Sequence, residues 1–299
     1  MSQKIDMYVA SKISVINQEL DSIFKIKQFE KASFSEALSL LEQHSTKLSL
    51  DNSIHSINFK KNSVGVVEEF TNIYASAIYQ KIFNASKDEL RELLDIYYLK
   101  YQIHNIIVTL RCIASDYKKD LDFYLIGNKI QKEHCIKAVS FSYEESLKYF
   151  STKFKFPKLL LQFNTINSIM QLETGLYKWY HEELQKFLSE KYQNSTLQIE
   201  HKKHIDIINK KIIKIAQEIE NFDVELFLIN RGNTKISSLK PSIETLEELE
   251  ELQLAFKSQV YNKTKYEEFG THFMILNFLQ KFEIKMKEIS KKLKEKALN

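Results

Sequence analysis

Two long segments of this chain repeat the same order of features, and this repeat constrains the fold more than any other property. In each segment a polar residue, followed three positions later by an asparagine, interrupts an apolar pattern of helical spacing. A short apolar run and a glycine turn come next, and the asparagine and glycine are 22 residues apart in one copy (127 − 105) and 23 in the other (232 − 209). The six marker residues are Gln102, Asn105 and Gly127 in one copy, and Asp206, Asn209 and Gly232 in the other.

The N-terminus carries a shortened third copy. The stretch "YVASKISVINQEL" places Ser14 and Asn17 on the same polar-x-x-Asn pattern, and "KASFSEALSLL" resembles "AVSFSYEESLKYF". The period of about 100 residues exceeds that of stacked solenoid repeats, so each copy is expected to be a small domain. The predicted domains are 1–85 (the shortened copy), 86–190, and 191–299, which includes a C-terminal helix.

The fold class follows from the scarcity of turn-forming residues. Only five Gly and two Pro occur in 299 residues, and apolar residues recur at spacings of three and four instead of alternating. The sequence therefore predicts an all-α chain of long helices.

Several helix boundaries can be predicted from local signals. A Ser or Thr that caps a helix, with Glu three residues later, forms a capping box. Pro157 suits a first helical position and is expected to open a helical run over residues 157–192. The last helix is expected over about residues 265–294. The four predicted capping boxes are Ser33–Glu36, Ser86–Glu89, Ser142–Glu145 and Thr245–Glu248.

Charge and motif content disfavour several functions. The 43 basic and 39 acidic residues give a mixed surface, and only three of the basic residues are Arg (Arg91, Arg111 and Arg231), which disfavours nucleic-acid recognition. No glycine-rich phosphate loop occurs, no apolar run is long enough to span a membrane, and no secretory signal is visible. Cys112 and Cys135 have no metal spacing and are expected to be buried thiols.

Histidines are the remaining candidates for chemistry. His201 and His204 are three apart, a spacing that places two metal ligands on one helical face. Two lysines between them, and no partner on another recognisable element, favour a solvated face instead. His104, beside Asn105, is expected to be a packing residue. We therefore expect no catalytic, cofactor-binding or metal residues, and no cofactor.

The repeat units resemble the C/d subunit family of rotary V-type and A-type ATPases. Asp206-Ile-Ile-Asn209 matches the family's Asp-x-x-Asn, and "KYQIHNIIVTLR" is similar to its tyrosine-rich helix, with Gln102 where Asp is usual. "LIGNKI" and "LINRGNTKI" are similar to its glycine turns. "YVASKISVINQEL" resembles its N-terminal helix, with Lys12 and Asn17 where Arg and Glu are usual.

The resemblance implies a funnel-like molecule of three similar helical domains around a pseudo-threefold axis. It implies a non-catalytic socket in the central stalk, on the cytoplasmic face of the membrane proteolipid (c/K) ring and around the foot of the central axle (D/F type). Such a subunit takes part in ATP-driven ion transport or ATP synthesis, without binding nucleotide, and meets the membrane through partner subunits. The polar-x-x-Asn units are then expected to fix helix ends or neighbours within each domain.

Two other hypotheses remain open from the residues. An unrelated helical scaffold or adaptor that binds partners through its helical surfaces would share the amphipathic repeats. A metal-dependent helical enzyme built around His201 and His204 would use the spacing noted above.

Overall fold

Helices are the only regular elements in the part of the chain that the structure describes, which confirms the all-α prediction. In this computed structural model, every regular element among the described residues is a helix, with no β-strand. The described residues are 8–9, 11, 13–16, 31–47, 64–115, 121, 125–126, 129–193, 195–218, 224–230, 232–234, 248 and 266–298.

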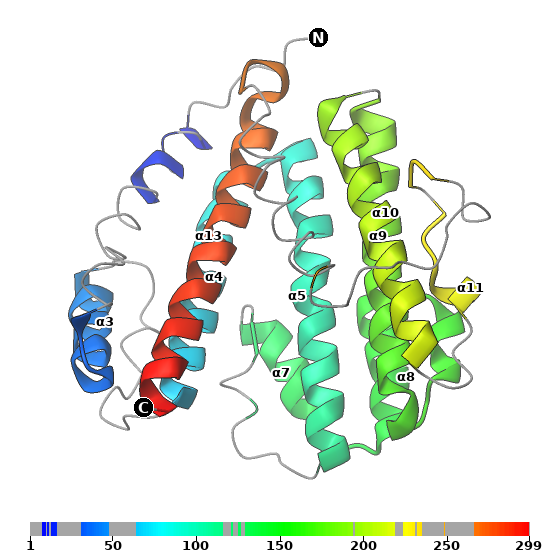
Figure 1. Ribbon diagram of the computed structural model, residues 1–299, viewed down its shortest axis with the longest axis horizontal. Coiled ribbons are helices and arrows are strands. Elements are labelled where there is room, and N and C mark those ends of the chain that lie inside the picture. Colours follow the sequence, from blue (N-terminus) through cyan, green and yellow to red (C-terminus); the bar gives the residue numbers. More distant parts are fainter. Residues whose placement is uncertain are drawn as a thin grey trace. The chain divides into compact units, whose positions relative to one another are not determined.

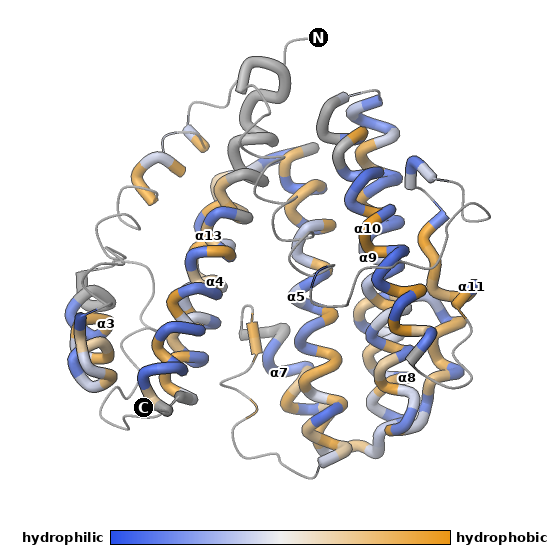
Figure 2. The backbone as a smooth tube through the Cα atoms, viewed as in Figure 1, coloured by the Kyte–Doolittle hydropathy of each residue, from blue (hydrophilic) through white to orange (hydrophobic). Residues whose placement is uncertain are grey.

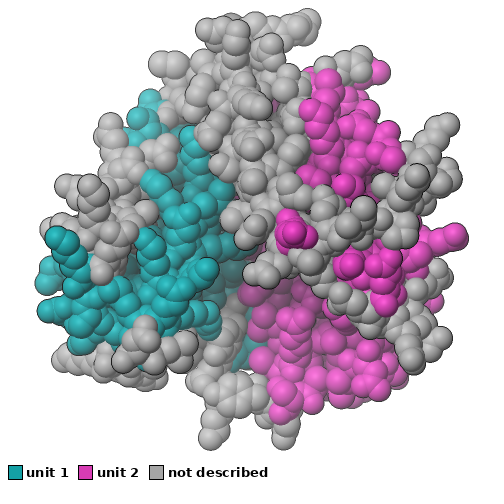
Figure 3. All heavy atoms as spheres, in the orientation of Figure 1, with its two compact units in different colours: residues 1–91, 117–137, 266–299 teal, residues 92–116, 138–265 magenta. Residues whose placement is uncertain are grey.

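The chain divides into two compact units, shown in different colours in Figure 3. Unit 1 comprises Met1–Arg91, Tyr117–Lys137 and Tyr266–Asn299, and unit 2 comprises Glu92–Asp116 and Ala138–Lys265. Each unit therefore brings together segments that are distant in the sequence.

Unit 1 is built around the packing of α13 against α4 (Figure 1). α3 also packs against α13. The helices of this unit are α3 (Phe34–Lys47), α4 (Val64–Ala85), α13 (Tyr266–Leu298) and, apart from its last residue, α7 (Lys129–Ala138).

Aromatic rings fill the interface between α4 and α13. Tyr74 of α4 lies with its ring centroid 5.5 Å from that of Phe282, and both side chains are buried. Near the start of α4, Glu68 pairs with Lys294 close to the end of α13, so the two helices run antiparallel. Over the coloured, C-terminal part of α13, Figure 2 shows hydrophobic and hydrophilic bands that alternate, as an amphipathic helix requires.

Unit 2 contains the remaining helices. The first turn of α5 belongs to unit 1 and the rest of the helix to unit 2. α9 and α10 form an antiparallel pair, in which Gln185 contacts His201 and Ser189 contacts Gln198 (Figure 1). The elements are α5 (Asp88–Ser115), α8 (Tyr143–Phe154), the 3₁₀ turns η3 (Lys158–Gln162) and η4 (Ile166–Ser168), α9 (Ile169–Lys191), α10 (Thr196–Glu218) and α11 (Val224–Phe227).

A close approach and an ion pair attach other segments of unit 2 to α9. η3 crosses α9 at Gly175, where a Cβ atom would lie 2.4 Å from Cδ2 of Leu160. Glu173, two residues earlier on α9, accepts a 2.6 Å contact from the guanidinium of Arg111 near the end of α5. The small residue on α9 therefore leaves space for the η3 leucine.

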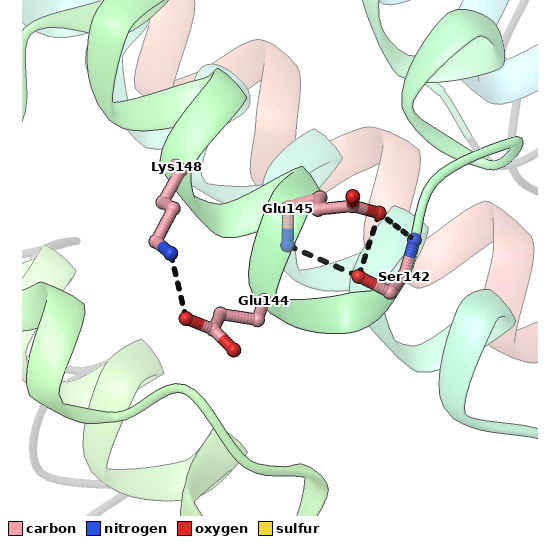
Figure 4. Close-up of polar contacts among 4 residues, drawn as sticks. All are labelled: Ser142, Glu144, Glu145 and Lys148. Carbon is pink, nitrogen blue, oxygen red and sulfur yellow. Dashed lines mark hydrogen bonds and ion pairs between the residues drawn. The ribbon is translucent and has the colours of Figure 1, made fainter.

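Two of the four predicted capping boxes are confirmed. In α8 the Ser142 hydroxyl accepts the N–H of Glu145, and the Glu145 carboxylate accepts the N–H of Ser142 (Figure 4). Ser33 and Glu36 make the same reciprocal pair before α3. The side chain of Glu89, and Thr245, lie outside the described residues.

The expectation for Pro157 is wrong, and that for the last helix is confirmed. Pro157 precedes the short 3₁₀ turn η3 and does not begin a long helix. The chain then breaks at Thr165, whose hydroxyl and N–H bond to Ser168 of η4, and a continuous α-helix begins only at Ile169. Serine and threonine compete in this way with helical backbone pairing. α13 covers nearly the predicted range.

Among the described helices, none is both long and apolar enough to cross a lipid bilayer.

Candidate functional site

Asn209 on α10 fixes the segment that follows α11. Its side-chain Nδ2 donates to the carbonyl oxygen of Ile229 at 3.0 Å, and its Oδ1 accepts the N–H of the same residue at 2.8 Å. Asn209 is fully buried and Ile229 is 1% exposed. One side chain therefore satisfies both backbone groups of a buried residue that no helix or strand partner serves.

Asp206, one helical turn before Asn209, holds the same segment farther along. Its Oδ1 accepts the N–H of Thr234 at 3.1 Å and its Oδ2 accepts the Thr234 hydroxyl at 3.2 Å. Residues three apart lie on one face of a helix. The pair Asp206 and Asn209 thus forms two attachment points, which we call the loop clamp.

Gly232 lies between these two attachment points. A Cβ atom at Gly232 would lie 2.1 Å from Oδ1 of Asp206 and 3.3 Å from Cγ2 of Ile205. Such a separation is shorter than any allowed contact, so a side chain at this position would displace the Asp206 carboxylate. The glycine is required here by close approach to α10.

Apolar packing and a lysine support the clamp from the α9 side. The Phe227 ring of α11 lies 5.6 Å, centroid to centroid, from that of Phe163, and it packs in a cluster with Leu228 and Ile212 of α10. Lys178 of α9 donates through Nζ to the carbonyl oxygen of Leu226 at 2.8 Å. α11 is consequently fixed by both α9 and α10.

For the other predicted marker residues the structure gives fewer contacts, and two of them lie outside the described residues. Asn105 is 2% exposed within α5, and its carbonyl oxygen accepts the hydroxyl of Thr109 at 2.7 Å. Gln102 is partly buried on the same helix. Gly127, and Asn17 of the shortened copy, lie outside the described residues. A clamp in the second copy therefore stays a prediction, whereas Asp206, Asn209 and Gly232 are brought together.

A second polar group lies between α9 and α10. His181 of α9 meets His201 and His204 of α10, and one ring nitrogen from each lies within 4.8 Å of those of the other two. Among the described residues, this is the one group of at least three such side chains with that geometry. We call it the histidine cluster.

The expectation that His201 lies on a solvated face is wrong. His201 is only 9% exposed because α9 packs over it, and burial lowers the pKa of its imidazole to about 4. His204 is partly buried. His181 was not predicted as a member of this group; its position beside Tyr180 places it on the stripe of α9 that the structure buries.

The hydrogen bonds of His201 define which of its nitrogens carries the proton. Its Nδ1 lies 2.7 Å from Oε1 of Gln185, an oxygen that only accepts. A neutral His201 therefore donates from Nδ1, and the lone pair of its Nε2 faces Nδ1 of His181 at 3.5 Å. Gln185 is itself oriented, since its Nε2 donates to the hydroxyl of Ser189 at 3.2 Å.

The cysteines show no comparable arrangement. Cys135 is buried, as expected, and Cys112 is partly buried. Desolvation raises the pKa of the Cys112 thiol, which favours the unreactive protonated form.

Comparison with known families gives one match. The family described as ATP synthase (C/AC39) subunit matches residues 25–298, which is more than nine-tenths of the chain. No curated protein matches the sequence.

Proposed function

Because the chain belongs to the ATP synthase (C/AC39) subunit family, we propose that it is the central-stalk socket of a rotary V-type or A-type ATPase. The membership itself makes the chain a non-catalytic subunit of such an ATPase, with other subunits of the complex as partners. The proposal adds that it joins the D/F-type axle subunits to the membrane proteolipid (c/K) ring.

The extent of the family match carries this proposal. Residues 25–298 include both long copies of the repeat, with their polar-x-x-Asn and glycine markers. A match to one helix would be compatible with any amphipathic bundle. An ordered match over nearly the whole chain favours the complete socket subunit over an unrelated scaffold or a metal-dependent enzyme.

The arrangement we propose has three helical domains, 1–85, 86–190 and 191–299, around a pseudo-threefold axis. The foot of the axle occupies the central cavity of this funnel, and the opposite end contacts the ring on the cytoplasmic side of the membrane. The near-equal spacing of markers in the two long copies supports it. In this arrangement the chain meets the membrane through its partners and binds neither nucleotide nor cofactor.

Stiffness is the physical requirement of a socket that transmits torque. α5 runs for 28 residues without a Gly or Pro, so its backbone hydrogen bonding is uninterrupted. The loop clamp adds rigidity in unit 2 because it ties a non-helical segment to α10 at two points. Both features support a role in which load passes through the subunit without local yielding.

The test is to remove the chain from the native complex and follow coupling. ATP hydrolysis and ATP-driven ion uptake are measured in parallel on membrane vesicles from deletion cells and from cells that express the tagged chain. We expect uptake to be lost without the chain and restored with it, and we expect ring and axle subunits to co-purify with the tag. Uptake that persists in the deletion vesicles, or a tagged chain that recovers neither partner, would refute the proposal.

A further inference from the structure

We propose that His181, His201 and His204 form a binding site for one Zn²⁺ ion between α9 and α10. Imidazole nitrogen is a preferred zinc ligand, and three histidines with water in a fourth position form a known tetrahedral set. The inference does not depend on the rotary function, because it concerns contacts within one unit of the chain.

The spacing of the ring nitrogens fits such an ion. Two nitrogens at zinc-bond length in a tetrahedron are about 3.3 Å apart, and Nδ1 of His181 lies 3.5 Å from Nε2 of His201. His204 offers its nitrogen within 4.8 Å of both. Closing the set around one ion requires the nitrogen of His204 to approach the other two to about 3.3 Å.

The backbone elements explain why the three rings converge. His201 and His204 are three residues apart on α10 and share a face, while Lys203 between them is exposed on another face. The antiparallel packing of α9 then brings His181 to the same level. The lysines between the two histidines are therefore no reason against an ion at the cluster, although their place in the sequence indicated one.

The surroundings orient His201 as a metal ligand. Metal-binding histidines ordinarily donate their second N–H to an oxygen that fixes the ring. Gln185 supplies that oxygen at 2.7 Å and is 1% exposed, and its own amide is held by Ser189. Ser189 also accepts from Nε2 of Gln198, so a buried polar chain supports the ligand from behind.

The contact between His201 and His181 is weak without an ion. A separation of 3.5 Å is beyond the usual range for an N–H donor and a lone pair. A zinc ion bound to both nitrogens would replace this long contact with two metal–nitrogen bonds.

The experiment measures zinc binding by the full-length chain after treatment with a chelator. Calorimetric titration with ZnCl₂ is expected to give one equivalent per chain and a raised Tm, with no response to MgCl₂. Substitution of Co²⁺ is expected to give the visible absorption of a tetrahedral ion. His204→Ala and His181→Ala are each expected to weaken zinc binding by about tenfold or more.

Matched variants keep the test decisive. His134, a partly buried histidine of α7 outside the cluster, serves as the control, and His134→Ala should bind zinc like the unmodified chain. Because His201→Ala risks misfolding, the partly buried His204 is the principal test position. Absence of saturable zinc binding, or equal affinity in His204→Ala and the unmodified chain, would overturn the proposal and leave a histidine hydrogen-bond pair.

Discussion

The amide of Asn209 pairs with both the N–H and the carbonyl oxygen of Ile229, so a helix side chain acts here as a neighbouring strand would. Both residues are buried, which excludes water as a substitute partner. The interaction therefore contributes more than an exposed hydrogen bond of the same length.

Asn209→Ala is expected to destabilise the protein by about 3 kcal/mol, because it leaves two buried backbone groups of Ile229 without partners. Urea denaturation followed by circular dichroism measures the loss. Asn233→Ala is the matched control, since Asn233 lies on the same segment but is exposed. Equal stability of the two variants would contradict the role given to Asn209.

Gly232→Ala is expected to destabilise by about 1–3 kcal/mol, because the added Cβ displaces the Asp206 carboxylate from Thr234. In an Asp206→Ala background the obstructing oxygen is gone, and the cost of the same change should fall below about 1 kcal/mol. A double-mutant cycle with the four proteins measures the coupling. Additive effects would show that the two residues act independently.

Ser142→Ala is expected to cost about 1 kcal/mol at neutral pH, since it removes the N-cap of α8. Ser142→Thr keeps a capping hydroxyl and should cost less. An equal loss of stability in Ser142→Ala and Ser142→Thr would argue against the cap.

The same cap predicts a pH dependence. Hydrogen bonds from the N–H and then the hydroxyl of Ser142 lower the pKa of Glu145 below its ordinary value of 4.5. Because the folded pKa is lowered, the stabilisation is complete above pH 4.5 and is lost as the pH falls through the folded pKa. NMR titration of the Glu145 carboxyl should show its pKa rising part of the way towards 4.5 in Ser142→Ala, because the alanine keeps the backbone N–H and loses the hydroxyl. An unchanged titration would be evidence against the bond from the hydroxyl.

Asn105→Ala tests whether the second copy of the repeat uses its asparagine as the third copy does. Asn105 is 2% exposed, and we expect a loss of about 1–3 kcal/mol, comparable with that of Asn209→Ala. Gln102→Ala, at a partly buried position on the same helix, should cost less than about 1 kcal/mol. A larger cost at Gln102 than at Asn105 would reverse the roles assigned to the two markers.

Much of the fold could be predicted from local sequence signals. The capping pairs at Ser33 and Ser142 formed because each needs only residues within one helical turn. α13 was predicted almost to its limits because its apolar stripe is long and uninterrupted. The prediction of one long helix after Pro157 was wrong because the Ser168 hydroxyl bonds to both the N–H and the carbonyl oxygen of Thr165. Apolar spacing does not reveal this alternative to helical pairing.

The two sites differ in how far the sequence reveals them. The loop clamp could be found because its motif recurs along the chain, so Asp206 and Asn209 were identified by comparison with Gln102 and Asn105. The histidine cluster could not, since it depends on the register between α9 and α10. That register is set by tertiary packing, and no periodicity within one helix encodes it.

The antiparallel contact between α4 and α13 also affects how the chain acquires its structure during synthesis. About 180 residues separate the end of α4 from the start of α13, which is about 10–40 s of translation at usual rates. Through that interval the apolar face of α4, including Tyr74 that finally packs against Phe282, has no α13 to cover it. The N-terminal part of unit 1 therefore depends on a segment that is made much later, and chaperones have a defined window in which to bind it.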